Sequence, residues 1–183
     1  MNLRLITAPT VEPVDLTTVK AFLRVDGTAE DTLITSLAKA AREKGELLAR
    51  RAFITQTWDL VLEYWPYDWL HGIKLYRPPL QSITSVKYTD RSNVEHTFTD
   101  FVADVRSEPG VLLLKSLPST TLQYSGAIVI RYIAGYGDAG SAVPERLKDS
   151  ILALTSYWYE NRETHEVPTD IKRAFIAERA VWL

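Results

Sequence analysis

The chain has 183 residues, of which 46% are hydrophobic, and a formal charge of -2 at pH 7. This length is typical of one domain, or of one domain with a large insertion, and allows a sizeable core. The near-neutral charge argues against a dedicated DNA-binding protein, which usually carries a clustered basic excess. The chain has no cysteine, which excludes disulfides, thiolate nucleophiles and thiolate metal sites. No apolar run is long enough for a signal peptide or a membrane span, so we expect a soluble protein made in the cytoplasm.

Residues 1–54 are predicted to be the N-terminal helical part of the fold. Asp15 is a suitable N-cap for a short amphipathic helix over residues 16–25. The Asp26–Gly27 pair then indicates a turn. Thr28 and Asp31 form a capping-box pattern that opens a longer helix over residues 29–51.

Residues 55–134 have the period of strands. The stretch TWDLVLEYW alternates between two sides, with Trp58, Leu60 and Leu62 on one and Asp59 and Val61 on the other. Six further runs, IKLYRPPL, SITSVKYTD, VEHTFT, FVADV, GVLLLK and AIVIRYIA, are separated by turn-forming residues. Short strands joined by turns favour antiparallel meanders over parallel units with crossover helices.

Residues 135–183 are predicted to be helical again. Leu147, Ile151, Leu154 and Trp158 recur at three- to four-residue spacing after Pro144, which suits the first turn of a helix. Thr169 or Asp170 is expected to cap a last helix over residues 171–183. The predicted fold is α+β, with about four helices and an antiparallel β insertion between the second and third helices.

Gly135, Gly137 and Gly140 spell the G-x-G-x-x-G motif of dinucleotide-binding loops. That motif requires a following parallel strand and glycines that open a helix. Here Pro144 is the natural helix start, and the remaining residues look helical. We therefore predict a glycine-rich turn and no nucleotide cofactor.

No other pattern indicates catalysis or a bound metal. His71, His96 and His165 are not spaced four residues apart, and no third ligand is placed to join them to Glu95, Glu163 or Glu166. The chain contains neither a G-x-S-x-G motif nor a Walker-type loop. An enzyme is not expected.

An aromatic segment, YWPYDWL, lies in a predicted connection between strands and contains Tyr64, Trp65, Tyr67 and Trp69. Connections normally run over the surface, where exposed aromatic side chains are typical of protein–protein hot spots. Two alternatives remain open at this point: the segment folds back as a hydrophobic plug, or it contacts a neighbouring subunit.

The order of these elements resembles the head–tail connector (adaptor) proteins of tailed bacteriophages, prophages and gene transfer agents. The resemblance spans nearly the whole chain and rests on ITQTWDL, RPPLQSITSV and the block AGYGD…VPERLK…YENRE. It implies a helical connector core with a β insertion, no enzymatic activity and no cofactor. It also implies a ring, usually of twelve copies, at the neck of a virion or phage-like particle assembled in the host cytoplasm.

In that family the ring binds beneath the portal protein, meets a stopper or tail-completion protein below, and lets DNA pass through its lumen without sequence-specific binding. By position, the resemblance assigns portal docking to the C-terminal segment, here Ile171, Lys172, Arg173, Phe175, Arg179, Trp182 and Leu183. No membrane is involved. The alternative is a β-rich module that binds a ligand or a protein as a monomer.

Overall fold

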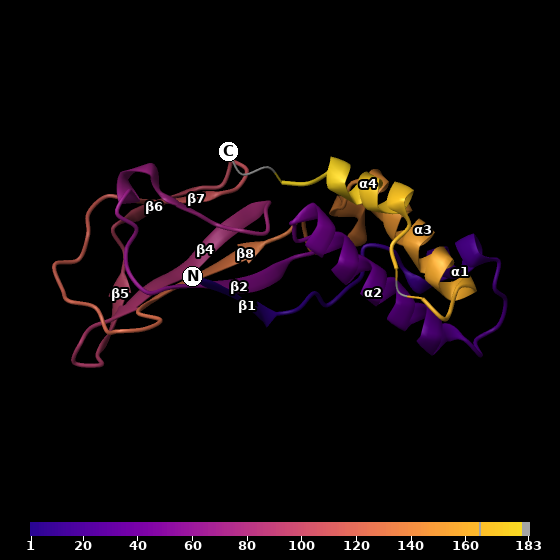
Figure 1. Cartoon of the computed structure of the whole chain (residues 1–183), viewed down its shortest axis with the longest axis horizontal. Helices are drawn as coiled ribbons and strands as arrows, with labels where there is room; N and C mark the ends of the chain where they lie inside the picture. The colour runs from indigo at the N-terminus through magenta and orange to yellow at the C-terminus, as the bar shows by residue number, and fades with distance from the viewer. Residues whose placement is uncertain (165, 181–183) are drawn as a thin grey trace. The chain divides into compact units, whose positions relative to one another are not determined.

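A computed structural model describes residues 1–164 and 166–180 of the chain (Figure 1). The described residues form two compact units. The β unit comprises Met1–Ala8 and Thr55–Gly135, and the helical unit comprises Pro9–Ile54 and Tyr136–Ala180. The fold class is confirmed as α+β, with its strands mainly between the second and third helices.

Within the described residues, the helical unit contains four α-helices: α1 (Leu16–Leu23), α2 (Asp31–Ala49), α3 (Glu145–Glu160) and α4 (Thr169–Ala177). Its core consists of their apolar faces and includes the predicted stripe Leu147, Ile151, Leu154 and Trp158. Asp15 is the N-cap of α1, as predicted, and its Oδ1 accepts a hydrogen bond from the Thr18 backbone N–H at 2.8 Å.

Two predicted helix caps are wrong. Helix α2 begins at Asp31 with Glu30 at the N-cap position, and no side chain caps it. The carboxylate of Asp31 instead accepts from Lys20 Nζ of α1 at 2.6 Å, so a contact between helices replaces the local capping box. Helix α4 already begins at Thr169, after Pro168, and neither Thr169 nor Asp170 caps it.

The β unit contains two antiparallel sheets. The larger has the order β1 (Asn2–Thr7), β2 (Gln56–Leu62), β8 (Ile128–Ala134), β4 (Leu80–Thr89) and β5 (Glu95–Phe98). The smaller has the order β3 (Ile73–Lys74), β7 (Val111–Leu114) and β6 (Phe101–Asp104). Leu60, Ile130 and Val86 lie opposite one another in the large sheet and are fully buried.

The opposite face of the large sheet carries a buried charge at Asp59. Its cross-strand partner is Arg131, whose Nε and Nη2 donate to the two carboxylate oxygens of Asp59, each at 2.8 Å. This two-bonded pairing raises the pKa of Arg131 and compensates the burial of Asp59. Successive side chains of β2 therefore still point to opposite faces of the sheet, although the residue at position 59 is a buried aspartate.

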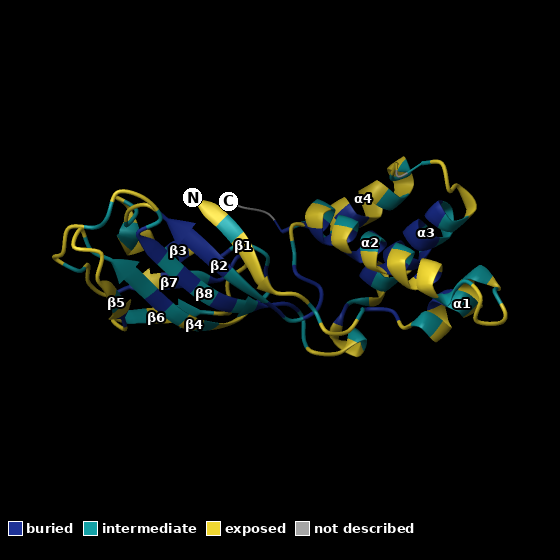
Figure 2. Ribbon diagram, turned by 90° about the horizontal axis from the view of Figure 1, so that it is seen from below, coloured by how far each residue is buried: buried dark blue, intermediate teal, exposed yellow. Residues whose placement is uncertain are grey.

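Strand β1 corrects the expectation that residues 1–54 are helical. Asn2–Thr7 pairs with β2, which lies about fifty residues later in the chain. Most of its side chains are exposed (Figure 2). The strand therefore lacks the alternation of buried and exposed residues that reveals a strand in a sequence.

The glycine-rich stretch forms a turn, as predicted. Gly135 has φ +133°, a conformation that L side chains rarely adopt. A Cβ on Gly140 would lie 2.4 Å from the Pro13 backbone oxygen, so a close approach of two chain segments requires glycine there. Helix α3 starts only at Glu145, beyond all three glycines. Among the helices described, none is long and apolar enough to cross a membrane.

Candidate assembly surfaces

The aromatic segment, Tyr64–Trp69, divides into a packed part and an exposed part. The Trp65 ring is half-buried, with its centroid 5.4 Å from that of Phe98 and 6.3 Å from that of Tyr88. Trp65 thus packs against rings of β4 and β5, as the plug alternative requires.

The other side chains of this segment are available for contact. Tyr67 is fully exposed and Tyr64 is 72% exposed, while Trp69 is half-buried in the short 3-10 helix η1 (Trp69–His71). Leu70 adds an apolar side chain that is also 72% exposed. An exposed cluster of this kind is the surface that the subunit-contact alternative requires. Each alternative therefore fits part of the segment.

Helix α4 is anchored to the helical unit by Phe175. This side chain is completely buried, and its ring stacks on Phe53 with centroids 6.4 Å apart. A Cβ on Gly45 of α2 would lie 2.5 Å from Phe175 Cε1, so any larger residue at position 45 would clash with the ring. Of the residues assigned to portal docking, Phe175 is therefore a core residue in this structure.

The other residues assigned to portal docking lie at different depths. Lys172 and Arg173 are exposed on α4, and Arg179 is half-buried. Ile171 is half-buried against the core of the helical unit. Trp182 and Leu183 lie outside the described residues. The exposed surface of α4 thus carries Lys172 and Arg173, together with Asp170, which lies 3.9 Å from Arg173, and the apolar Ile176.

Backbone contacts fix the end of α4. Arg51 Nε donates to the Glu178 carbonyl at 2.6 Å, and the Ala180 N–H donates to the Ala49 carbonyl at 3.0 Å. The end of α2 and the segment after α4 are therefore held together within the helical unit.

A buried charge network centred on Arg42 was not predicted from the sequence. Arg42 is 3% exposed, and it donates to Glu12 at 2.7 Å and to Glu46 at 2.9 Å. Burial alone would lower the pKa of Arg42, but these carboxylates raise it above its usual value. The second oxygen of Glu46 accepts from the Phe53 N–H at 2.8 Å, and the Phe53 carbonyl accepts from the Tyr136 N–H at 3.2 Å.

This network joins three segments of the chain to α2, because Glu12, Phe53 and Tyr136 each lie on a different connection out of the helical unit. The available signal was the pair Arg42 and Glu46, four residues apart on the face of α2 that also carries Ile34, Ala38 and Ala49.

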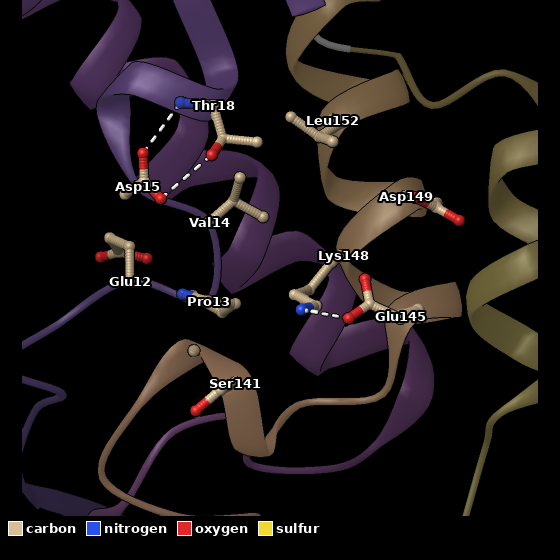
Figure 3. Close-up of a pocket in the computed structure, with 11 residues that line it drawn as sticks. Glu12, Pro13, Val14, Asp15, Thr18, Ser141, Glu145, Lys148, Asp149 and Leu152 are labelled. Atoms are coloured by element: carbon tan, nitrogen blue, oxygen red, sulfur yellow. Dashed lines mark hydrogen bonds and ion pairs between the residues drawn. The ribbon is translucent and has the colours of Figure 1, made fainter.

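A cleft of about 340 Å³ lies in the helical unit between the segment before α1 and the start of α3 (Figure 3). Four acidic residues line this cleft: Glu12, Asp15, Glu145 and Asp149. The carboxylates of the first three already have partners. Asp15 accepts from Thr18, which holds the pKa of Asp15 below its usual value. Glu145 pairs with Lys148 at 2.6 Å, and Glu12 is bound to Arg42.

The histidines provide no metal site in the part of the chain that the structure describes, where no cluster of three or more potential ligands occurs. His96 lies 2.8 Å from Asp90, and His71 lies 2.5 Å from Asp68, so each has one carboxylate partner. The His96 contact lowers the pKa of Asp90. His165 lies outside the described residues.

Comparison with solved structures decides the fold. One similar chain, from the virion of a native gene transfer agent particle, has a TM-score of 0.81 and 22% sequence identity. The alignment covers 100% of this chain and 97% of that one. The fold is that of a gene transfer agent particle chain.

Two other similar chains come from particle necks. One belongs to the neck of an empty gene transfer agent particle computed with C6 symmetry, with a TM-score of 0.79 and 23% identity. Another belongs to the neck of a native particle computed with C12 symmetry, with a TM-score of 0.74 and 22% identity. In both cases the alignment covers 100% of this chain and 97% of the other. No protein-family model and no curated protein matches the sequence.

Proposed function

We propose that this protein is a head–tail connector (adaptor) that forms a ring in the neck of a phage-like particle, beneath the portal. The observation that carries the proposal is the full-length match, because it extends over both units and almost the whole of each matched chain, two of which come from particle necks. A fold shared only through a common domain would leave one unit, or part of the other chain, unmatched.

The proposed role is structural, without catalysis or a cofactor, in a ring of twelve copies. The C12 symmetry of a neck that contains a similar chain supports this copy number. The formal charge of -2 suits a conduit, because a strongly basic lumen would hold DNA through counterion release. The partners proposed are the portal above, a stopper or tail-completion protein below, and DNA in transit.

Two surfaces are proposed for these contacts. Tyr64, Tyr67 and Trp69 contact a neighbouring subunit, with Trp65 supporting them from the β-unit core. The exposed face of α4 around Lys172 and Arg173 faces the portal, with Phe175 as its anchor. The aromatic character of the first surface suits a subunit interface, and the charge of the second suits a polar rim.

The test is the particle mass by light scattering, for the purified protein alone and mixed with the portal protein from the same locus. A closed ring, or a portal-dependent increase of about one copy per portal subunit, is expected for a head-to-tail assembly. A protein that stays monomeric and ignores the portal at every concentration would contradict the proposal and favour a monomeric ligand-binding module.

A further inference from the structure

The two sheets of the β unit have four edges, formed by β1, β5, β3 and β6. A sheet edge presents unpaired N–H and C=O groups, and proteins usually protect such edges with charge or with very short strands. Two of these edges are protected. Strand β3 has only 2 residues. Strand β5 carries the exposed Glu95, whose carboxylate pairs with Lys87 at 2.6 Å.

The other two edges each carry two exposed apolar side chains beside a single charge. On β1, Leu5 is 46% exposed and Ile6 is 45% exposed. Next to β6, Val105 is 44% exposed, and Val102 within the strand is 47% exposed. Neither strand contains proline or lysine. Edges of this kind are templates for pairing with another strand.

The charges on these two edges are opposite. Strand β1 carries one charged residue, Arg4, which is exposed. Strand β6 ends in Asp104, whose carboxylate also accepts from the Arg106 N–H at 3.0 Å and from the Ser107 hydroxyl at 2.5 Å. If Arg4 and Asp104 lie opposite each other in an antiparallel pair, Leu5 faces Ala103. Ile6 then faces Val102 if the outer edge of β1 continues in regular register past the irregularity that β1 shows against β2 between Leu5 and Thr7. Opposite-charge and apolar cross-strand pairs both stabilise a sheet.

The same register also matches the faces of the two sheets. Leu5 lies opposite Trp58, on the face of the large sheet that continues to the fully buried Leu60. Ala103 lies opposite the fully buried Leu112, on the inner face of the small sheet. Arg4 and Asp104 both lie on the other faces of their sheets. A pair in this register therefore aligns inner face with inner face.

We propose that strand β1 of one copy adds to the β6 edge of a second copy, in antiparallel register with Arg4 opposite Asp104. Because the two edges are different, each copy offers one of each, and the contact is head-to-tail and can close into a ring. This inference rests on the proposed ring and names backbone pairing in the β units as one of its contacts.

The absence of native cysteine permits a clean cross-linking test on the full chain. The variant Ile6→Cys/Val102→Cys places the two thiols directly opposite each other between copies, within reach of a disulfide after a small movement. The matched control is Ile6→Cys/Val94→Cys, because Val94 is also exposed, at 49%, but lies beside the protected strand β5. Both variants are oxidised under assembling conditions, with the portal present if it is required.

A ladder of covalent species larger than dimers, in the Val102 variant and absent from the control, is the expected result on non-reducing gels. Each single-cysteine variant should stop at the dimer. A second variant, Ile6→Lys/Val102→Lys, adds edge protection and should lower the assembled fraction about tenfold or more at fixed concentration, with the monomer's thermal unfolding unchanged.

The outcomes separate this inference from the function proposed above. If light scattering finds rings but the Val102 variant gives no ladder, the β1–β6 contact is wrong while the connector function stands. If rings form equally well with the two lysines, the contact is again wrong. If no assembly forms under any condition, both proposals fail.

Discussion

Replacing Gly45 with alanine tests the anchoring of α4. Gly45 lies inside α2, where alanine normally stabilises a helix by about 1 kcal/mol relative to glycine. Here the added Cβ would lie 2.5 Å from Cε1 and 2.9 Å from Cζ of the Phe175 ring, closer than carbon atoms approach in proteins. Overpacking of this kind costs about 1–3 kcal/mol. We therefore expect Gly45→Ala to leave the free energy of unfolding unchanged or to lower it by up to about 2 kcal/mol.

The sign should reverse when the ring is absent. Phe175→Ala alone should cost about 3–5 kcal/mol, because it empties a fully buried site. In that background the Cβ at position 45 meets no ring, and Gly45→Ala should stabilise by up to about 1 kcal/mol. The double-mutant cycle should therefore give a coupling free energy of about 1–3 kcal/mol.

The assay is urea unfolding followed by helical circular dichroism, which reports mainly on the helical unit. The control for propensity alone is the difference between Ser36→Ala and Ser36→Gly on the exposed face of α2. If Gly45→Ala stabilises the wild-type protein by the full propensity gain, the ring of Phe175 does not lie over Gly45.

Three further changes test other parts of the structure. Arg42→Leu should cost about 3–5 kcal/mol in urea unfolding, because it leaves the buried Glu46 and the half-buried Glu12 without their cation, and a cost below about 1 kcal/mol would contradict a buried network. Asp15→Ala should cost about 1 kcal/mol through the lost cap of α1. Because folding lowers the pKa of Asp15, that difference should be fully present above the ordinary aspartate pKa of 3.8 and lost as the pH falls through the folded-state pKa, and a difference that persists at the lowest pH would contradict the charge assignment. Tyr64→Ser/Tyr67→Ser should weaken assembly at unchanged monomer stability, whereas Trp65→Ser should lower the stability of the β unit itself, and equal effects of the two on stability would contradict the division of the aromatic segment.

The elements with strong periodicity were predictable from the sequence. Leu147, Ile151, Leu154 and Trp158 form a helical stripe, and all four are buried in α3. The strands between α2 and α3 were predicted because turn residues separate runs of β-forming residues. The glycine-rich turn was also predicted. A nucleotide-binding loop needs its glycines at the start of a helix, whereas Pro144 places the helix start beyond all three glycines.

What depended on distant contacts was not predicted. Strand β1 forms because β2 offers an edge about fifty residues away, and its own side chains give little sign of it. Phe175 was assigned to a docking surface, since the sequence does not show that Gly45 opens a space for its ring. The sequence also did not show which aromatic side chain of Tyr64–Trp69 packs into the β unit. That depends on the contact between Trp65 and Phe98, which lie 33 positions apart in the chain.

The bond from the Tyr136 N–H to the Phe53 carbonyl, at 3.2 Å, has a consequence for how the protein can be rebuilt. Phe53 and Tyr136 flank the β insertion Thr55–Gly135, and this bond holds the two flanking residues next to each other. A few glycine and serine residues would span that gap, and an unrelated sheet with neighbouring termini could be grafted there. Such an exchange would also have to replace strand β1, which lies outside the insertion but pairs with β2.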